Sequence, residues 1–172
     1  MRAEARQEYV EYVTARLPSL RRLAYLLCGD EHTADDLVQQ TITKLYVRWR
    51  RIGGVEHVDQ YVRTMLVRTF LDERRRPWSR VGLDGVPRDT PDPGSGVDHV
   101  ADHVVLRAAL ARVPRRQQAV LVLRFLCDLP VEEVATILDC APGTVKSQSA
   151  RGLATLRRLL GAHQPTTLRE VT

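Results

Sequence analysis

Apolar residues recur along almost the whole chain at spacings of three and four residues, the period of a helix with one buried face. Strand-like alternation of apolar and polar residues is absent from the sequence. The pattern therefore predicts an all-α fold. The helical segments are expected at residues 3–28, 33–51, 58–76, 98–113, 115–126, 131–138 and 142–160.

Proline and glycine divide this pattern. Pro18 predicts one broken helix or two abutting helices within residues 3–28. Gly29 and Asp30 end this segment, and Thr33 is a plausible N-cap of the next helix. Residues 77–97 contain four of the nine Pro and four of the ten Gly and show no helical stripe. We therefore expect two small helical domains joined by a flexible linker. Their expected ranges are 1–76 and 98–160, with the linker at 77–97 and a disordered tail at 161–172.

Residues 130–158 read as two short helices joined by a tight turn. The segment 131–138 has one apolar face, and the periodicity breaks before Pro142. Proline suits the first position of a helix, where its missing N–H has no partner to lose. On the second helix, small residues and Arg occupy the face opposite the apolar side, which suits insertion into the major groove of DNA. This layout predicts a helix-turn-helix; a helical hairpin in some other all-α domain is the alternative.

Composition restricts the function without assigning it. The 172 residues carry a formal net charge of +5, too mild for a polycationic tail. The sequence has no run of 18 apolar residues and no apolar signal segment, so we expect a cytoplasmic protein without membrane insertion. Cys28, Cys127 and Cys140 are too widely spaced for a zinc site or a disulfide framework. His99 and His103 lack a third strong ligand, and we expect no metal and no cofactor.

The polar residues of the first unit have two interpretations on local grounds. Asp35 and Asp36 suit the first turn of a helix, where the dipole favours carboxylates. Arg48 and neighbouring arginines surround Trp49, an arrangement suited to single-stranded DNA, where bases stack on rings and phosphates meet Arg. Taken alone, the same pattern favours a core position for Trp49, with the arginines at the negative end of the helix dipole.

In combination, these features resemble a bacterial sigma factor of the extracytoplasmic-function group, the minimal two-domain members of the sigma-70 family. The resemblance covers about residues 5–160. Residues 34–41 look like region 2.2, which in the family docks on the clamp helices of RNA polymerase. Residues 61–75 look like regions 2.3 and 2.4, which open and read the −10 promoter element. Residues 110–126 look like region 4.1, and residues 143–157 look like region 4.2, which reads the −35 element.

The resemblance implies roles for three sets of residues. Polymerase docking is implied for the polar face of the first unit, formed by Asp35, Asp36, Gln39 and Gln40. Recognition and melting of the −10 element are implied for Arg48, Trp49, Arg63, Arg68, Arg74 and Arg75. Recognition of the −35 element is implied for Thr144, Lys146, Ser147, Gln148 and Arg151, with Arg115 and Arg116 holding phosphate.

The function implied by the resemblance is that of a promoter-specificity subunit, not an enzyme. It binds core RNA polymerase through the clamp helices and the flap, and it initiates transcription of a dedicated regulon from promoter DNA. An anti-sigma factor is a further implied partner. The chain departs from the family pattern at three positions, with Gln40 for a usual Glu, Arg68 for a common Asn, and Pro130 for a capping Ser or Thr.

Two other functional classes remain as alternatives. A stand-alone helix-turn-helix regulator with an N-terminal sensor domain predicts a dimer and a palindromic site. The polar stripe of Asp36, Gln40 and Thr43 and the basic cluster at Trp49 argue against it. A small enzyme is the other class, but the sequence shows no nucleophile–base pair, phosphate loop or metal-ligand set.

Overall fold

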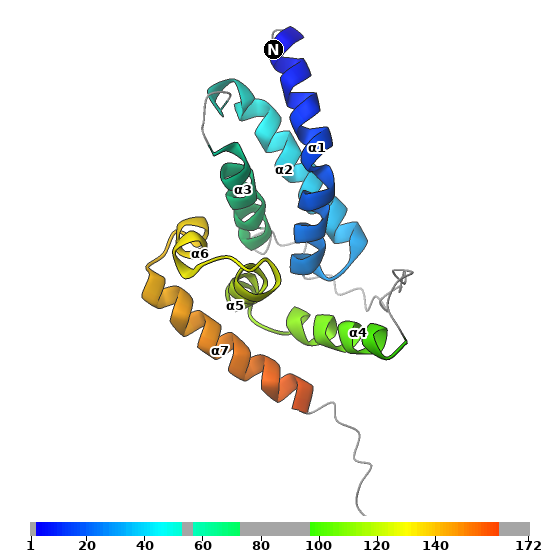
Figure 1. The fold of residues 1–172 in the computed structure, drawn as a ribbon, viewed down its shortest axis with the longest axis vertical. Helices are drawn as coiled ribbons and strands as arrows, with labels where there is room; N and C mark the ends of the chain where they lie inside the picture. Colours follow the sequence, from blue (N-terminus) through cyan, green and yellow to red (C-terminus); the bar gives the residue numbers. More distant parts are fainter. Residues whose placement is uncertain (1–2, 53–56, 73–96, 162–172) are drawn as a thin grey trace, which may run out of the picture.

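The computed structural model describes residues 3–52, 57–72 and 97–161. Within these ranges the chain is helical and contains no strand, which confirms the all-α prediction. The elements are α1 (Ala3–Cys28), α2 (Glu31–Ile52), α3 (Val58–Asp72), α4 (Val97–Ala111), α5 (Arg115–Leu121), the π-helix η3 (Val122–Leu126), α6 (Val131–Leu138) and α7 (Pro142–Gly161). In Figure 1, α1 to α3 form one half of the molecule, and α5 and α6 lie between α3 and α7. Most of the predicted linker and tail falls in ranges 73–96 and 162–172, outside the described residues.

Helix α1 continues through Pro18, so the prediction of a broken or divided helix is wrong. A proline inside a helix removes one N–H donor and crowds the carbonyl four residues earlier. Both Pro18 and Thr14 are exposed here, so water can solvate the Thr14 carbonyl that loses its partner. After the proline, Leu20, Leu23 and Leu27 are buried, and this burial favours continuation of the helix.

The turn between α1 and α2 uses Asp30 as the cap instead of Thr33. Gly29 has a φ of 82°, a conformation that glycine adopts without steric cost. The Oδ1 atom of Asp30 then accepts a hydrogen bond from the backbone N–H of Thr33 at 2.8 Å. This is the N-cap geometry for a helix that begins at Glu31, two residues earlier than the sequence pattern predicted.

The core of the first unit is apolar, with two buried threonines. Leu37, Leu45, Leu66 and Phe70 are the large side chains at its centre, each at most 1% exposed. The buried hydroxyls of Thr41 and Thr69 bond to backbone carbonyls one turn earlier, at Leu37 and Met65. The Nζ atom of Lys44 donates to Thr69 Oγ1 at 2.9 Å, which links α2 to α3.

The predicted helix at 115–126 changes from an α-helix to a π-helix halfway along its length. It is α-helical to Leu121 and then widens into the π-helix η3. The N–H of Cys127 bonds to the carbonyl of Val122 at 2.9 Å, a spacing of five residues. The wider turn keeps Val122 and Leu123 fully buried but leaves Phe125 53% exposed and Leu126 40% exposed.

The helix-turn-helix prediction is confirmed in α6 and α7, whose boundaries agree with the sequence to within one residue. Asp139 closes α6 in the left-handed conformation, with a φ of 51°. The N–H of Cys140 then bonds to the carbonyl of Ala135 at 3.0 Å, which completes the turn. Pro130 precedes α6 in an extended conformation and provides no side-chain cap.

Helix α7 packs closely against α5 at Gly152. A Cβ atom at this position would lie 3.1 Å from Leu121 Cγ and 3.3 Å from Gln117 Cβ.

We expect Gly152→Ala to lower the free energy of unfolding by about 1–3 kcal/mol, because these neighbours must shift in a packed interior. Thermal or urea unfolding measures the loss. Gly161→Ala is the control, since nothing lies within 4 Å of its added methyl group; equal stability of the two variants would contradict the close packing.

The two helical units pack against each other. One continuous cluster of buried side chains runs from Leu20 in α1 through Phe70 in α3 to Val120, Ile137 and Val145 in the second unit. A smaller cluster of Leu110, Val113 and Leu121 lies under α7. Because the core is shared, α3 packs against α5 and α6 as well as against α1 and α2.

Candidate nucleic-acid interface

The outer face of α7 presents polar and basic side chains to solvent. Lys146, Ser147 and Arg151 are exposed, whereas Thr144 and Gln148 are half-buried. On the opposite side, Val145 and Gly152 are buried against the rest of the unit. The five residues predicted to read the −35 element therefore share one accessible stretch of helix, as the helical period requires.

Arg115 and Arg116 begin α5 but point in different directions. Arg116 is exposed, and its Nη2 atom donates to the carbonyl of Leu138 at 3.3 Å, beside the turn of the helix-turn-helix. The guanidinium carbon of Arg115 lies 4.2 Å from the centre of the Phe70 ring in α3. Arg116 is therefore placed beside the turn that leads into α7, whereas Arg115 is turned towards the first unit.

The polar face of α2 is open to solvent. Asp35, Asp36 and Gln39 are exposed, and Gln40 is half-buried. Asp35 forms an ion pair with Arg21 of α1, with 3.0 Å between Oδ1 and Nε. The four residues predicted to dock on polymerase thus lie together on one side of the helix, one turn apart.

The basic residues predicted to act at the −10 element are only partly brought together. Arg48 and Arg68 are exposed, and Arg48 Nη1 lies 3.4 Å from the hydroxyl of Tyr61. Arg63 is half-buried and turned towards α6, where it meets Glu133. Arg74 and Arg75 lie outside the described residues. Tyr61 is an aromatic neighbour of Arg48. It begins the stretch 61–75 that resembles regions 2.3 and 2.4, but it is not in the set of residues that the resemblance implied for the −10 element.

Trp49 is part of the core, so its ring is not available for stacking on bases in this conformation. The residue is 6% exposed and packs on Tyr9 and Tyr12, with ring centres 5.4 and 5.2 Å away. The large apolar surface of the indole favours this position over solvent, even though its Nε1–H has no hydrogen-bond partner among the described residues. The core position of Trp49, which the local pattern favoured, is therefore the one observed.

A groove runs between the two units, lined by residues of α1, α3 and η3. The groove has a volume of about 450 Å³, and its lining includes Arg22, Arg63, Leu126 and Cys127. Burial raises the pKa of the Cys127 thiol, against the opposing effect of Arg63 and Arg22. The thiol is therefore protonated at neutral pH, which makes it a poor nucleophile.

At the mouth of this groove, Tyr12 donates a hydrogen bond to Asp59 at 2.8 Å. Burial and this hydrogen bond raise the pKa of Tyr12. Arg16 reaches the same carboxylate, with 2.6 Å between Nη2 and Oδ2. These contacts join α1 to the start of α3.

Within the described ranges, no three His, Cys, Asp or Glu side chains gather into a group that could hold a metal ion. The side chains of His99 and His103 lie outside that part of the structure. None of the helices in residues 3–52, 57–72 and 97–161 is long and apolar enough to cross a membrane.

Two family models match the chain. Residues 12–80 match the model for Sigma-70 region 2, and residues 103–156 match the model for Sigma-70 region 4. The two matches fall on the two helical units, with the polar face of α2 in the first and the helix-turn-helix in the second.

Curated relatives and solved structures agree with these matches. The chain is 35% identical over 156 residues to the RNA polymerase sigma-E factor of Streptomyces coelicolor, covering 90% of this chain and 87% of that protein. It is 31% identical over 149 residues to the ECF RNA polymerase sigma factor EcfG of Rhodopseudomonas palustris, covering 86% and 82%. The fold is similar to that of the sigma factor RpoE of Bartonella quintana, solved with the anti-sigma factor NepR. The two structures superpose with a TM-score of 0.72 at 24% sequence identity. The match covers 92% of this chain and 99% of the other.

Proposed function

The chain belongs to the extracytoplasmic-function group of the sigma-70 family of RNA polymerase sigma factors. From this membership we propose which of its surfaces bind promoter DNA and which bind core RNA polymerase. We assign region 2 to residues 1–76 and region 4 to residues 98–160. The observation that carries the proposal is the exposed polar and basic face of α7 in a helix-turn-helix, on a unit separate from the polar face of α2.

The outer face of α7 reads the −35 element in the major groove. Gln148 suits bidentate contact with adenine, Lys146 suits guanine, and Arg151 reaches either guanine or phosphate. Thr144 and Ser147 supply hydroxyls at the helix end that enters the groove first. Arg116 holds a phosphate beside this face, and Arg115 joins it once released from Phe70.

The −10 element meets the first unit at the basic residues of α2 and α3. Arg48 and Arg68 are exposed and supply positive charge for the strand. Tyr61, half-buried beside Arg48, replaces Trp49 as the aromatic residue available for stacking. Arg63 contributes when it is free of Glu133, and Arg74 and Arg75 extend the basic run beyond the described residues.

Core RNA polymerase docks on the exposed face of Asp35, Asp36, Gln39 and Gln40, with its clamp helices as the counterpart, and the flap contacts region 4. The polymerase supplies all the catalysis, and this chain contributes only binding, in the cytoplasm where polymerase works. We also assign it an anti-sigma partner. The similar structure of RpoE was solved as a complex with the anti-sigma factor NepR.

Run-off transcription with core RNA polymerase on genomic promoter fragments tests the proposal. We expect promoter-specific transcripts that depend on this protein, with DNA binding far weaker in the absence of core enzyme. The protein alone carries only a mild net charge of +5, which favours weak, salt-sensitive DNA binding. A protein that bound DNA tightly as a dimer, and never bound core polymerase, would contradict the proposal and favour the regulator with a sensor domain.

A further inference from the structure

Tyr12 of α1 contacts both helices that meet at the Arg48–Tyr61 pair. Its ring packs against Trp49 near the end of α2, with ring centres 5.2 Å apart. Its hydroxyl donates a hydrogen bond to Asp59 Oδ1, in the first turn of α3, at 2.8 Å. Trp49 follows Arg48 directly in the sequence, and Asp59 precedes Tyr61 by two residues. One side chain of α1 therefore holds α2 and α3 at the place where Arg48 meets Tyr61.

The carboxylate of Asp59 anchors the first turn of α3. Its other oxygen accepts from Arg16 of α1, with 2.6 Å between Nη2 and Oδ2, so the same helix holds both oxygens. The side chains of this ion pair are half exposed, and water weakens their attraction. Arg16 has a long side chain that can follow the carboxylate, whereas the Tyr12 hydroxyl sits on a ring packed against Trp49. The hydrogen bond from Tyr12 is therefore the more constraining of the two contacts.

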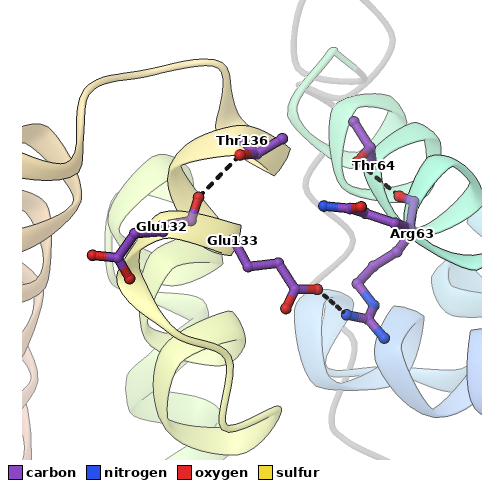
Figure 2. Close-up of polar contacts among 6 residues, drawn as sticks. Arg63, Thr64, Glu132, Glu133 and Thr136 are labelled. Carbon is purple, nitrogen blue, oxygen red and sulfur yellow. Dashed lines mark hydrogen bonds and ion pairs between the residues drawn. The ribbon is translucent and has the colours of Figure 1, made fainter. Parts of the chain in front are cut away.

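The position of the Tyr61 ring follows the position of its helix. Tyr61 packs partly against the core, and its hydroxyl lies 3.4 Å from Arg48 Nη1, close to the long limit of a hydrogen bond. The next polar residues of α3 are bonded elsewhere. Figure 2 shows Arg63 paired with Glu133 of α6 and the hydroxyl of Thr64 bonded back to its own helix. The placement of the first turn of α3 therefore decides where this ring lies.

We propose that Tyr12 is a positioning residue for −10 recognition: its hydrogen bond to Asp59 places the first turn of α3 so that Tyr61 presents its ring, beside Arg48, to an unstacked base. The inference rests on the stacking role that we assign to Tyr61 above. The ring of Tyr61 stacks on the base, while the guanidinium of Arg48 meets a neighbouring phosphate. Tyr12 acts through α3 and makes no contact with DNA.

Tyr9, one turn earlier on α1, provides a matched control. Its ring packs on the same Trp49 at 5.4 Å, and its hydroxyl also donates at 2.8 Å, but to the carbonyl of Ile42 in α2. Burial raises the pKa of both tyrosines, so both hydroxyls are protonated donors at neutral pH. Tyr9→Phe and Tyr12→Phe each keep the ring and lose one hydrogen bond, so thermal unfolding should show similar losses of stability. Only Tyr12→Phe releases α3.

Binding of the holoenzyme to the −10 non-template strand tests the role of Tyr12. The probe is a single-stranded oligonucleotide from a promoter found by run-off transcription, with 2-aminopurine at each position in turn. Stacking on an aromatic ring quenches the fluorescence of this base. We expect Tyr12→Phe to weaken binding about fivefold and to remove the quenching at the stacked position, because the Tyr61 ring is displaced. Tyr9→Phe should keep both the wild-type affinity and the quenching.

Further variants separate positioning from a loss of stability. Tyr61→Ala removes the stacking ring and should weaken strand binding about 10- to 100-fold. Because Tyr12 acts through Tyr61, the double variant with Tyr12→Phe should bind no more weakly than Tyr61→Ala alone. Asp59→Asn keeps an oxygen that accepts from Tyr12 and loses the ion pair with Arg16. It should bind the strand within about twofold of wild type.

The outcomes distinguish this inference from the proposed function. An effect of Tyr61→Ala without one of Tyr12→Phe would overturn the inference and leave the stacking role of Tyr61 intact. Equal losses of affinity for Tyr9→Phe and Tyr12→Phe, or additive losses in the double variant, would also overturn it. An ineffective Tyr61→Ala would remove both the stacking role and the inference, while promoter-specific transcripts from the wild type would preserve the sigma function. An absence of such transcripts would refute the function, and the inference with it.

Discussion

Replacing Asp36 by arginine should weaken binding to core RNA polymerase by at least about 100-fold and abolish promoter-specific transcription. Asp36 is exposed on the polar face of α2, so the substitution changes the charge of that face by two units without disturbing the core. Like charges brought together across an interface cost several kcal/mol, and about 2.7 kcal/mol already corresponds to a factor of 100. Co-purification with core enzyme or fluorescence anisotropy measures the affinity.

Glu8→Arg is the matched control for this variant. Glu8 is an exposed acidic residue of α1 outside the docking set, and its replacement makes the same change in net charge. We expect it to bind core enzyme about as well as wild type. If both variants lost binding equally, total charge and not the α2 face would determine docking; if neither did, the docking surface lies elsewhere on the molecule.

Replacing Arg151 by alanine should reduce transcription from promoters with an intact −35 element by roughly 10- to 100-fold, with core binding unchanged. A good side-chain contact to a base edge contributes about 1–3 kcal/mol of discrimination, and an exposed Arg on the outer face of α7 is placed to make one. Run-off transcription on intact and scrambled −35 templates measures the effect. The variant should discriminate between the two templates roughly 10- to 100-fold less than wild type, because it has lost one of the side chains assigned to base contacts.

Arg158→Ala, on the last turn of the same helix, separates sequence reading from general charge. It removes one exposed positive charge from α7, outside the set that we assign to the −35 element. We expect a small, uniform loss on every template, with the ratio between intact and scrambled templates preserved. A change in that ratio as large as for Arg151→Ala would argue that α7 does not read the −35 element through its N-terminal half.

Local periodicity and turn chemistry were sufficient for the all-α fold and for the helix-turn-helix. Val134, Ala135 and Leu138 are buried on the face that their spacing marks, and Pro142 begins α7 as its missing N–H predicts. These features depend on residues a few positions apart. The helical period likewise places Asp35, Asp36 and Gln39 on one side of a helix, although the role of this polar face came from resemblance to a family.

The wrong predictions share a different cause. Thr33 and Asp30 are both acceptable caps, and the packing of α2 on α1 selects the earlier one. Pro18 disfavours a helix locally, but the buried leucines after it hold α1 in one piece. Trp49 differs from these two, because the local pattern favoured the core position that it occupies. Only the structure shows that Tyr9 and Tyr12, some forty residues earlier, enclose its ring.

By itself, then, the sequence determined which segments are helical, where the reading helix begins and which of its residues face outward, because these follow from the 3.6-residue period and from turn chemistry. Only the tertiary structure decided how α3 meets α6. Arg63 and Glu133 are 70 residues apart, and nothing in the spacing of either helix marks them as partners. The pairing exists because burial of the shared apolar core brings the two units together, and that same packing turns Arg63 towards Glu133 and Arg115 towards Phe70.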